Sequence, residues 1–194
     1  GGFVRRVPSG TLELDLVVPR DRAGAWSHRL QTAGVRPAGI WAYEALRVAA
    51  RRPRLGVDTD ERTIPHEVGW IGSAVHLDKG CYRGQETVAR VHNLGRPPRM
   101  LVLLQLDGSS DRPATGDPVT AGGRTVGRLG TVVDHVDDGP IALALLKRGI
   151  PVDTQLVTGG EVAVAAVIDP DSMPAADTTA GAGRAAVDRL RSGT

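Results

Sequence analysis

The sequence predicts an α+β fold in which a helix-containing part is followed by a small antiparallel β-barrel. One strand-like stretch, residues 12–18, precedes two helix-like stretches, so the first part lacks the alternation of a repeated β-α-β unit. The composition changes at residues 95–98, where two prolines would stop a helix. Beyond them, short apolar runs alternate with turn residues, a pattern typical of a barrel or sandwich.

The first part is predicted to run strand, helix, helix. Residues 12–18 alternate apolar and polar side chains, as a half-buried strand does. Asp21 is a candidate cap for the first helix, which Gly34 would close. A second helix is expected to open at residues 37–39. The stretch 51–66 is rich in Arg, Pro, Gly and Asp and is expected to form a long loop.

The second part is predicted to consist of short strands joined by tight turns. Gly122 and Gly123 are expected to form one hairpin turn, and residues 137–139 a second turn. The expected strands are residues 100–106, 118–121, 126–133, 141–146 and 161–168. The predicted domains are therefore residues 1–95, a barrel at 96–169, and a disordered tail at 170–194 with one short helix at 184–190.

Composition limits the class of protein. The chain has 194 residues, 41% of them hydrophobic, and a single cysteine, which excludes an internal disulfide framework and fits a reducing cytoplasm. A net charge of +2 does not by itself indicate direct binding to nucleic acid. No apolar run approaches the ~20 residues of a membrane span. Because the chain starts without methionine or a signal-peptide pattern, we expect a piece of a longer protein.

The most informative stretch is residues 79–86, Lys-Gly-Cys-Tyr-Arg-Gly-Gln-Glu, hereafter the signature loop. Cationic Lys79 and Arg83 flank Cys81 and favour its thiolate, the reactive form. The loop leads into a predicted helix whose positive end favours the same charge state. Gly80 and Gly84 would serve backbone geometry. The alternative is a lone cysteine in a turn without a chemical role, and no histidine has the spacing to form a metal site with it.

The signature loop resembles the Lys-Gly-Cys-Tyr-x-Gly-Gln-Glu motif of the YgfZ family of folate-binding proteins, relatives of the glycine-cleavage T-protein (aminomethyltransferase). The match is complete from Lys79 to Glu86 and includes Gln85. The resemblance covers roughly residues 10 to 168, and it implies the C-terminal part of a T-protein-like folate-binding domain followed by a β-barrel. Further matching stretches are residues 45–48, 56–58, 64–67, 116–119, 126–127 and 141–144.

The resemblance also implies a folate site. Glu67 and Arg47 would line it, Glu67 by accepting two hydrogen bonds from the pterin edge. Tyr82 would stack on the heterocycle or pack against the barrel. Alanine at position 49 stands where the T-protein pattern has glutamate. This departure leaves three alternatives: Glu67 alone recognises the pterin, affinity is low, or the pocket takes a different ligand.

The function implied by the resemblance is a tetrahydrofolate-dependent factor that supports iron–sulfur cluster assembly or repair in client enzymes. Cys81 would engage a cluster, a client thiol or a folate-linked intermediate, and Lys79 would keep it ionised. Through cluster-dependent clients, the link to tRNA modification would be indirect. The expected partners are folate and these clients, with no direct nucleic acid contact and no membrane, in the cytoplasm.

Two alternatives remain open at the level of sequence. The first is an aminomethyltransferase of the glycine cleavage system, an enzyme with the same fold and cofactor. Cys81 and Ala49 argue against it. The T-protein lacks the cysteine motif, and its pattern has glutamate at the position of Ala49. The second alternative is a non-catalytic module that binds folate or a partner, for which Cys81 would be dispensable. The sequence thus leaves enzymatic activity undecided.

Overall fold

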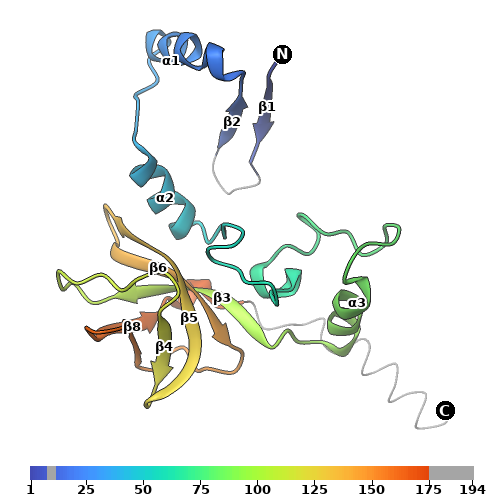
Figure 1. Ribbon diagram of the computed structural model, residues 1–194, viewed down its shortest axis with the longest axis vertical. Coiled ribbons are helices and arrows are strands. Elements are labelled where there is room, and N and C mark those ends of the chain that lie inside the picture. The colour runs from blue at the N-terminus through green and yellow to red at the C-terminus, as the bar shows by residue number, and fades with distance from the viewer. Residues whose placement is uncertain (8–11, 175–194) are drawn as a thin grey trace. The chain divides into compact units, whose positions relative to one another are not determined.

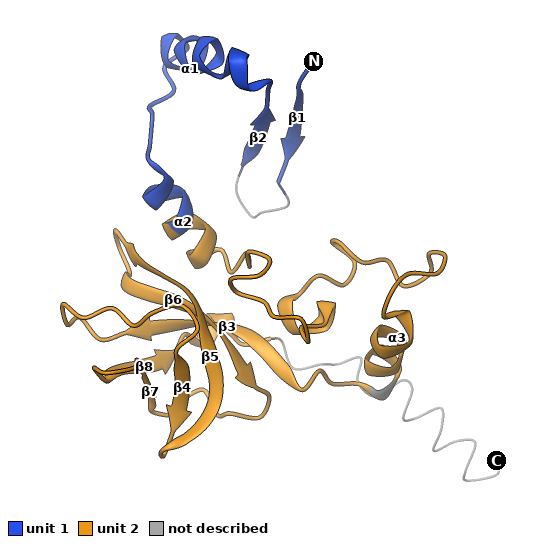
Figure 2. Cartoon of the chain, in the orientation of Figure 1, with its two compact units in different colours: residues 1–44 blue, residues 45–194 orange. Residues whose placement is uncertain are grey.

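The computed structural model describes residues 1–7 and 12–174 and divides into two compact units, Gly1–Glu44 and Ala45–Thr194 (Figures 1 and 2). The two units are taken separately below. Most of the predicted tail, including the helix expected at residues 184–190, lies outside the described residues. Within them, a 3-10 turn, η3, spans Pro170–Ser172. Throughout the described part of the chain, every helix is too short or too polar to cross a membrane.

The first unit begins with a β-hairpin (Figure 2). Strands β1 (Phe3–Arg6) and β2 (Leu14–Val17) pair antiparallel, and Arg5 forms an ion pair with Asp15, which lies directly opposite it. The strand predicted at residues 12–18 is therefore confirmed as β2. Sequence analysis missed β1, because its four residues show no alternation of apolar and polar side chains.

The predicted first helix is confirmed, but its predicted cap is wrong. Helix α1 (Ala23–Thr32) follows a 3-10 turn, η1 (Arg20–Arg22), and Asp21 lies inside that turn. Arg22 precedes α1 and makes no capping bond through its side chain. Gly34, two residues after the last residue of α1, terminates the helix as predicted, with a left-handed φ of +89°. Beyond it the Val35 amide donates back to the Leu30 carbonyl at 3.0 Å, as in a glycine-ended helix.

Three further helical elements lie between α1 and the barrel. Helix α2 (Ile40–Ala49) confirms the second predicted helix and contributes residues to both units. The following residues, 50–64, form only turns and extended backbone, as expected for this loop, and they lead into a 3-10 helix, η2 (Pro65–Val68). Helix α3 (Gln85–Leu94) follows the signature loop. The domain boundary expected at residue 96 stays a prediction.

The predicted antiparallel barrel is confirmed. Six strands close in the order β3-β6-β5-β4-β7-β8, and every neighbouring pair is antiparallel. Strand β7 was not predicted, since three residues are too few to show a pattern. The strands are β3 (Arg99–Leu106), β4 (Pro118–Ala121), β5 (Arg124–His135), β6 (Gly139–Lys147), β7 (Leu156–Thr158) and β8 (Val164–Ile168).

Glycines make the predicted turns. Gly122 and Gly123 join β4 to β5 with φ values of +54° and +76°, the two positive angles that a two-residue hairpin turn of type I′ needs. Gly139, at the turn from β5 to β6, has a φ of +69°. The first turn is thus confirmed where sequence analysis placed it, and the second lies one residue earlier than predicted, at residues 136–138.

Strand β6 is buried on both faces, and this explains its continuous apolar sequence. Ala142, Ala144 and Leu146 contribute to the barrel interior. Ile141 and Leu143 instead belong to a second apolar cluster on the outside of the barrel. The complete second cluster is Val48, Val68, Leu101, Leu103, Ile141, Leu143 and Leu145, with Ala49, Trp70 and Val133 packed against it. The end of α2 and η2 therefore cover the outer face of β3 and β6.

A buried carboxylate, Asp58, fastens the segment before the barrel to β5. Its side chain is only 1% exposed. One oxygen accepts hydrogen bonds from the Arg47 guanidinium at 2.8 Å and the Arg54 amide at 2.7 Å. The other accepts from the Thr131 amide at 2.6 Å and the Thr131 hydroxyl at 2.8 Å. Arg47 completes the cluster by donating to the Thr131 hydroxyl at 2.7 Å.

A β-bulge makes this attachment possible. The pairing of β5 with β6 shifts between Leu129 and Val132, so that two β5 residues lie opposite one residue of β6. The Thr131 amide donates to Asp58 there. A Cβ atom at Gly130 would overlap the Asp58 carboxylate. The bulge and the glycine therefore let the Asp58 carboxylate approach the strand closely.

A second ionic cluster centres on Arg99, at the start of β3. Its Nε and one terminal nitrogen donate to the two Glu67 carboxylate oxygens, each at 2.9 Å. The guanidinium also donates to Asp60 at 2.6 and 3.1 Å. Glu67 is 3% exposed and accepts a further bond from the Ile64 amide at 3.0 Å. The cluster therefore fixes η2 and the preceding turn against the first barrel strand.

Replacing Asp58 with asparagine is expected to lower the free energy of unfolding by about 3–5 kcal/mol, because the buried Arg47 guanidinium would lose its anionic partner. Urea titration monitored by circular dichroism measures this. The matched control is Asp134→Asn, whose carboxylate pairs with Arg112 at the surface, with an expected loss of at most about 1 kcal/mol. Similar losses for the two variants would contradict the structural role of Asp58.

Stability is expected to depend on Asp60 under acid conditions. Hydrogen bonds from Arg99 hold the pKa of Asp60 well below its ordinary value of 3.8. The contribution is therefore fully present above about pH 4 and is lost as the pH falls further, towards the lowered pKa of the folded state. Unfolding free energies measured from pH 6 to pH 2 should fall less steeply for Asp60→Asn than for the unchanged protein. The control is Asp111→Asn, at an exposed position. The role of Asp60 would be contradicted if the unfolding free energy of Asp60→Asn fell with pH as steeply as that of the unchanged protein. It would also be contradicted if Asp111→Asn showed the same reduced slope.

Candidate functional site

The signature loop leads directly into helix α3. Gly84 immediately precedes the helix with a φ of +81°, a left-handed angle that glycine adopts without strain. The Gln85 amide donates to the Tyr82 carbonyl at 3.2 Å, which closes the turn. Glu86 lies exposed in the first helical turn, where a negative charge is favourable. Gly80 is not among the glycines with positive φ, so of the two loop glycines only Gly84 needs its special backbone.

Cys81 is an exposed, free thiol. The rest of the signature loop is also exposed, except Tyr82 and Gln85, which are partly buried. The Lys79 ammonium lies 4.6 Å from the centroid of the Tyr82 ring, a cation–π contact. Lys79 and Tyr82 thus hold each other in place on the two sides of the cysteine. The effect of Lys79 on the thiol itself stays a prediction.

A cavity of about 910 Å³ lies beside the signature loop. One wall is the turn that leads into η2, and the other is the end of the signature loop with the first turn of α3. Tyr82, Arg83 and Gly84 of the loop line it directly. The remaining lining residues are Glu61, Arg62, Thr63, Ile64, Pro65, Val75, Thr87 and Val88. Its volume lies in the range of small-molecule sites, which combine an apolar lining with a few polar groups.

Arg47 and Glu67 are not among the residues that line this cavity. Both are at least 95% buried, and their charged atoms contact protein groups: Arg47 contacts Asp58 and Thr131, and Glu67 contacts Arg99. Their predicted contacts with a cofactor stay predictions. The contacts in the structure give Arg47 a bracing role between α2 and β5, and they give Glu67 a bracing role between η2 and β3.

Sequence analysis missed three contributors to this region. Asp60 and Arg99 hold the wall in place, and Arg62 lines the cavity. Asp58 accepts a hydrogen bond from the nearby Arg54 amide, as a turn residue does, but its bonds to Thr131 span 73 positions of sequence. No local pattern indicates such pairs. A surplus of aspartate and arginine in an irregular stretch, as in residues 47–62, was the available signal.

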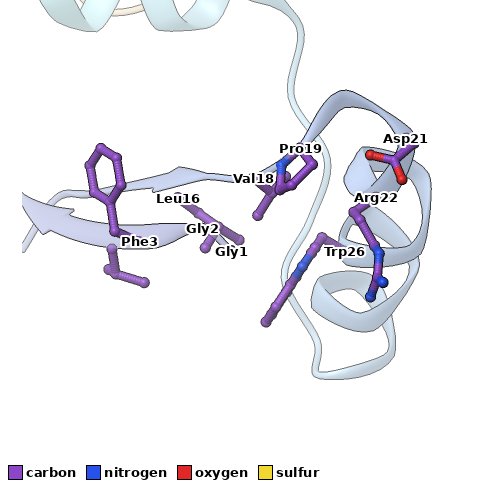
Figure 3. Close-up of a pocket in the computed structure, with 10 residues that line it drawn as sticks. Gly1, Gly2, Phe3, Leu16, Val18, Pro19, Asp21, Arg22 and Trp26 are labelled. Carbon is purple, nitrogen blue, oxygen red and sulfur yellow. The ribbon is translucent and has the colours of Figure 1, made fainter.

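The first unit has a cavity of its own, of about 630 Å³. Figure 3 shows Trp26 of α1 beside Val18 and Pro19, which follow β2, and it shows Phe3 on β1. The lining combines apolar side chains with the charged Asp21 and Arg22, and it includes none of the predicted site residues. Among residues 1–7 and 12–174, no group of three or more His, Cys, Asp or Glu side chains is placed to hold a metal ion.

Comparisons with known proteins agree with this architecture. Residues 99–175 match the family described as CAF17, C-terminal beta-barrel domain. Among solved structures, the glycine cleavage system aminomethyltransferase T from Bartonella henselae is similar in fold, with a TM-score of 0.68 and 20% identity over 86% of this chain and 48% of that chain.

Curated proteins that include a YgfZ protein and aminomethyltransferases are similar in sequence. The tRNA-modifying protein YgfZ of Aliivibrio fischeri is 32% identical over 149 residues, which cover 72% of this chain and 45% of YgfZ. The aminomethyltransferase of Symbiobacterium thermophilum is 35% identical over 121 residues, 59% of this chain and 31% of that enzyme. The chain thus spans less than half the length of these relatives. The predicted resemblance is confirmed: residues 99–175 match the CAF17 C-terminal β-barrel domain, and the chain is similar in sequence to YgfZ and to aminomethyltransferases.

Proposed function

We propose that this chain is part of a tetrahydrofolate-dependent factor that supports the assembly or repair of iron–sulfur clusters in client enzymes. One observation carries the proposal: the signature loop exposes the thiol of Cys81 beside a cavity of ligand size. A thiol that is accessible to a partner and next to a small-molecule site suits a factor that acts on another protein with the help of a bound cofactor.

The cavity supports the folate part of the proposal. Tyr82 contributes an aromatic ring to the lining, and Ile64, Pro65, Val75 and Val88 contribute apolar surface. Flat heterocycles bind such surfaces by stacking and by burial of apolar area. Lys79 lies over one face of the Tyr82 ring, so a stacked ligand would use the other face. The relationship to aminomethyltransferases, which the resemblance identifies as folate-dependent, points to the same ligand class.

The exposed thiol supports the second part of the proposal. Thiolates are ligands of iron–sulfur clusters and nucleophiles towards disulfides, and both roles require access from solvent. A single cysteine cannot hold a cluster by itself. Cys81 would therefore act as one ligand or one thiol in a transient complex with a client, whose own cysteines would supply the rest.

An aminomethyltransferase of glycine cleavage is the second candidate, favoured by the relatives and by the similar fold. Ala49 and the cysteine-containing loop argue against it, because both depart from the T-protein pattern. A non-catalytic folate-binding or scaffold module is the third. It differs from our proposal in a single property, namely that Cys81 would not be needed.

Complementation distinguishes these functions. The protein is expected to restore the activity of a cluster-dependent, tRNA-thiolating enzyme in cells that lack their own YgfZ-type protein. Cys81→Ala should abolish this rescue at equal protein levels, because alanine removes the sulfur and adds no new polar group. Ser73→Ala, another exposed position before α3, is the matched control and should rescue fully. Equal rescue by Cys81→Ala would remove the thiol from the mechanism and favour the scaffold module.

Tetrahydrofolate binding should depend on Tyr82. Replacing it with leucine keeps an apolar side chain but removes the stacking surface, and this should weaken binding about tenfold. Isothermal titration calorimetry with the purified protein measures the change. The chain has one other tyrosine, Tyr43 in α2, and Tyr43→Leu should leave the dissociation constant unchanged. A Tyr82→Leu protein that binds as tightly as the unchanged one would contradict the proposed place of the ligand.

A further inference from the structure

The cavity beside the signature loop has one wall that the barrel does not hold. In Figure 1 the chain between η2 and α3 is an irregular loop, residues 69–84, without a helix or strand of its own. Val75, Tyr82 and Arg83 of this loop line the cavity, and residues 61–65 form the other wall. Loops of this length are uncommon in a compact domain, and those at binding sites frequently move. The contacts of the loop divide it into a fixed part and a looser part.

The first part of the loop, residues 69–75, is held in place. Trp70 packs against the outer apolar cluster of β3 and β6. Its carbonyl accepts hydrogen bonds from the Ala74 and Val75 amides at 3.0 and 2.9 Å. The Gly72 amide donates to the Val75 carbonyl at 2.9 Å and closes the turn. Val75 therefore keeps its place in the cavity lining.

The second part of the loop, residues 76–83, hereafter the gate, is held only by local contacts. In the described part of the chain, its hydrogen bonds reach no further than the first residue of α3. The Asp78 amide donates to the His76 ring at 3.2 Å, and the Tyr82 carbonyl accepts from the Gln85 amide at 3.2 Å. Every gate residue is exposed or only partly buried. A segment with few buried contacts and only local bonds opens at a low cost in free energy.

The gate ends at Gly84, a residue suited to a pivot. Its φ of +81° is left-handed, and a Cβ atom there would meet no other atom within 4 Å. Glycine is therefore needed here for its backbone angle and not for lack of space, and glycine changes φ at little cost. Beyond it, Val88 is 4% exposed and anchors α3. The gate can thus rotate at Gly84 while α3 stays in place.

Opposite charges line the two walls of the cavity. Glu61 lies on the fixed wall and Arg83 on the gate, and both are exposed. Among residues 1–7 and 12–174, neither side chain forms an ion pair or a hydrogen bond. Movement of the gate towards the fixed wall would let the two side chains pair. Arg62 also lines the cavity and would oppose the approach of Arg83, so the pair is expected to be weak.

We propose that the gate closes over an occupied cavity, pairs Arg83 with Glu61, and turns the Cys81 thiol from solvent towards the bound ligand. In this structure Cys81 is exposed and lies outside the cavity lining, although Tyr82 and Arg83, which follow it, belong to the lining. A rotation at Gly84 that moves Arg83 inwards carries Cys81 with it. The thiol then faces a partner protein while the cavity is empty and the ligand while it is occupied. The identity of the ligand rests on the proposed function, whereas the movement of the gate does not.

The alkylation rate of Cys81 reports on the gate, because the chain has a single cysteine. Saturating tetrahydrofolate is expected to slow alkylation by iodoacetamide, followed by mass spectrometry, about tenfold as the closed form becomes dominant. Glu61→Gln should reduce this protection to about threefold, because the ion pair across the cavity is lost. The matched control is Glu86→Gln, which removes an exposed carboxylate outside the lining and should retain the tenfold protection.

Calorimetric titration of the same proteins separates this inference from the proposed function. If tetrahydrofolate binds but alkylation is not slowed, the gate is overturned and the proposed function stands. Equal protection of Cys81 in the Glu61→Gln and Glu86→Gln proteins would also overturn it, because the closed gate would then not depend on the ion pair.

If tetrahydrofolate does not bind, the proposed function fails, and a cross-link in the protein without ligand decides the inference. Arg62→Cys places a second thiol on the fixed wall. Oxidation by copper–phenanthroline in dilute solution should join it to Cys81, which requires Cα atoms within about 7 Å of each other, and Glu61→Gln should slow this reaction. Arg124→Cys, at an exposed position at the start of β5, is the control and should form no such bond. No cross-link at position 62, an unchanged rate with Glu61→Gln, or an equal yield from the control would overturn the gate.

Discussion

The burial of one carboxylate, Asp58, fixes the end of α2 and the loop after it against the barrel. A buried charge is costly unless its partners surround it, and here four donor groups from three residues do so. These partners come from α2, from the loop after it and from the bulge in β5. These bonds can form only when all three elements are in register. The Asp58 cluster therefore specifies where the loop lies as well as contributing to stability.

The Arg99 cluster fixes one side of the candidate site to the barrel. It joins the turn at Asp60 and the 3-10 helix at Glu67 to the first barrel strand. The residues between these two anchors, 61–65, form one wall of the cavity. A wall fixed at both ends to a closed barrel changes little when a ligand binds, so little of the binding free energy is lost to ordering it. The opposite wall comes from the exposed signature loop, where the thiol lies.

Sequence analysis predicted the elements that local chemistry determines. The hairpin glycines at 122 and 123, the end of α1 at Gly34 and most barrel strands follow from turn geometry and alternation. Strand β1 was missed because its residues do not alternate between apolar and polar, and β7 was missed because it is too short to show a pattern. The ion pairs were missed for a different reason, since Asp58 and Thr131 are 73 residues apart and only the folded chain brings them together. Resemblance alone directed attention to Arg47 and Glu67, and the structure adds the protein partners that occupy their charged atoms.

The central claim is that the cavity beside the signature loop receives the ligand. Heteronuclear NMR of the labelled protein, titrated with tetrahydrofolate, tests it most directly. The account predicts that shifted amide resonances gather at residues 61–65 and 82–88, with little change in β6 or in the β1–β2 hairpin. Shifts centred on either of those elements, or no shift at saturating ligand, would contradict it.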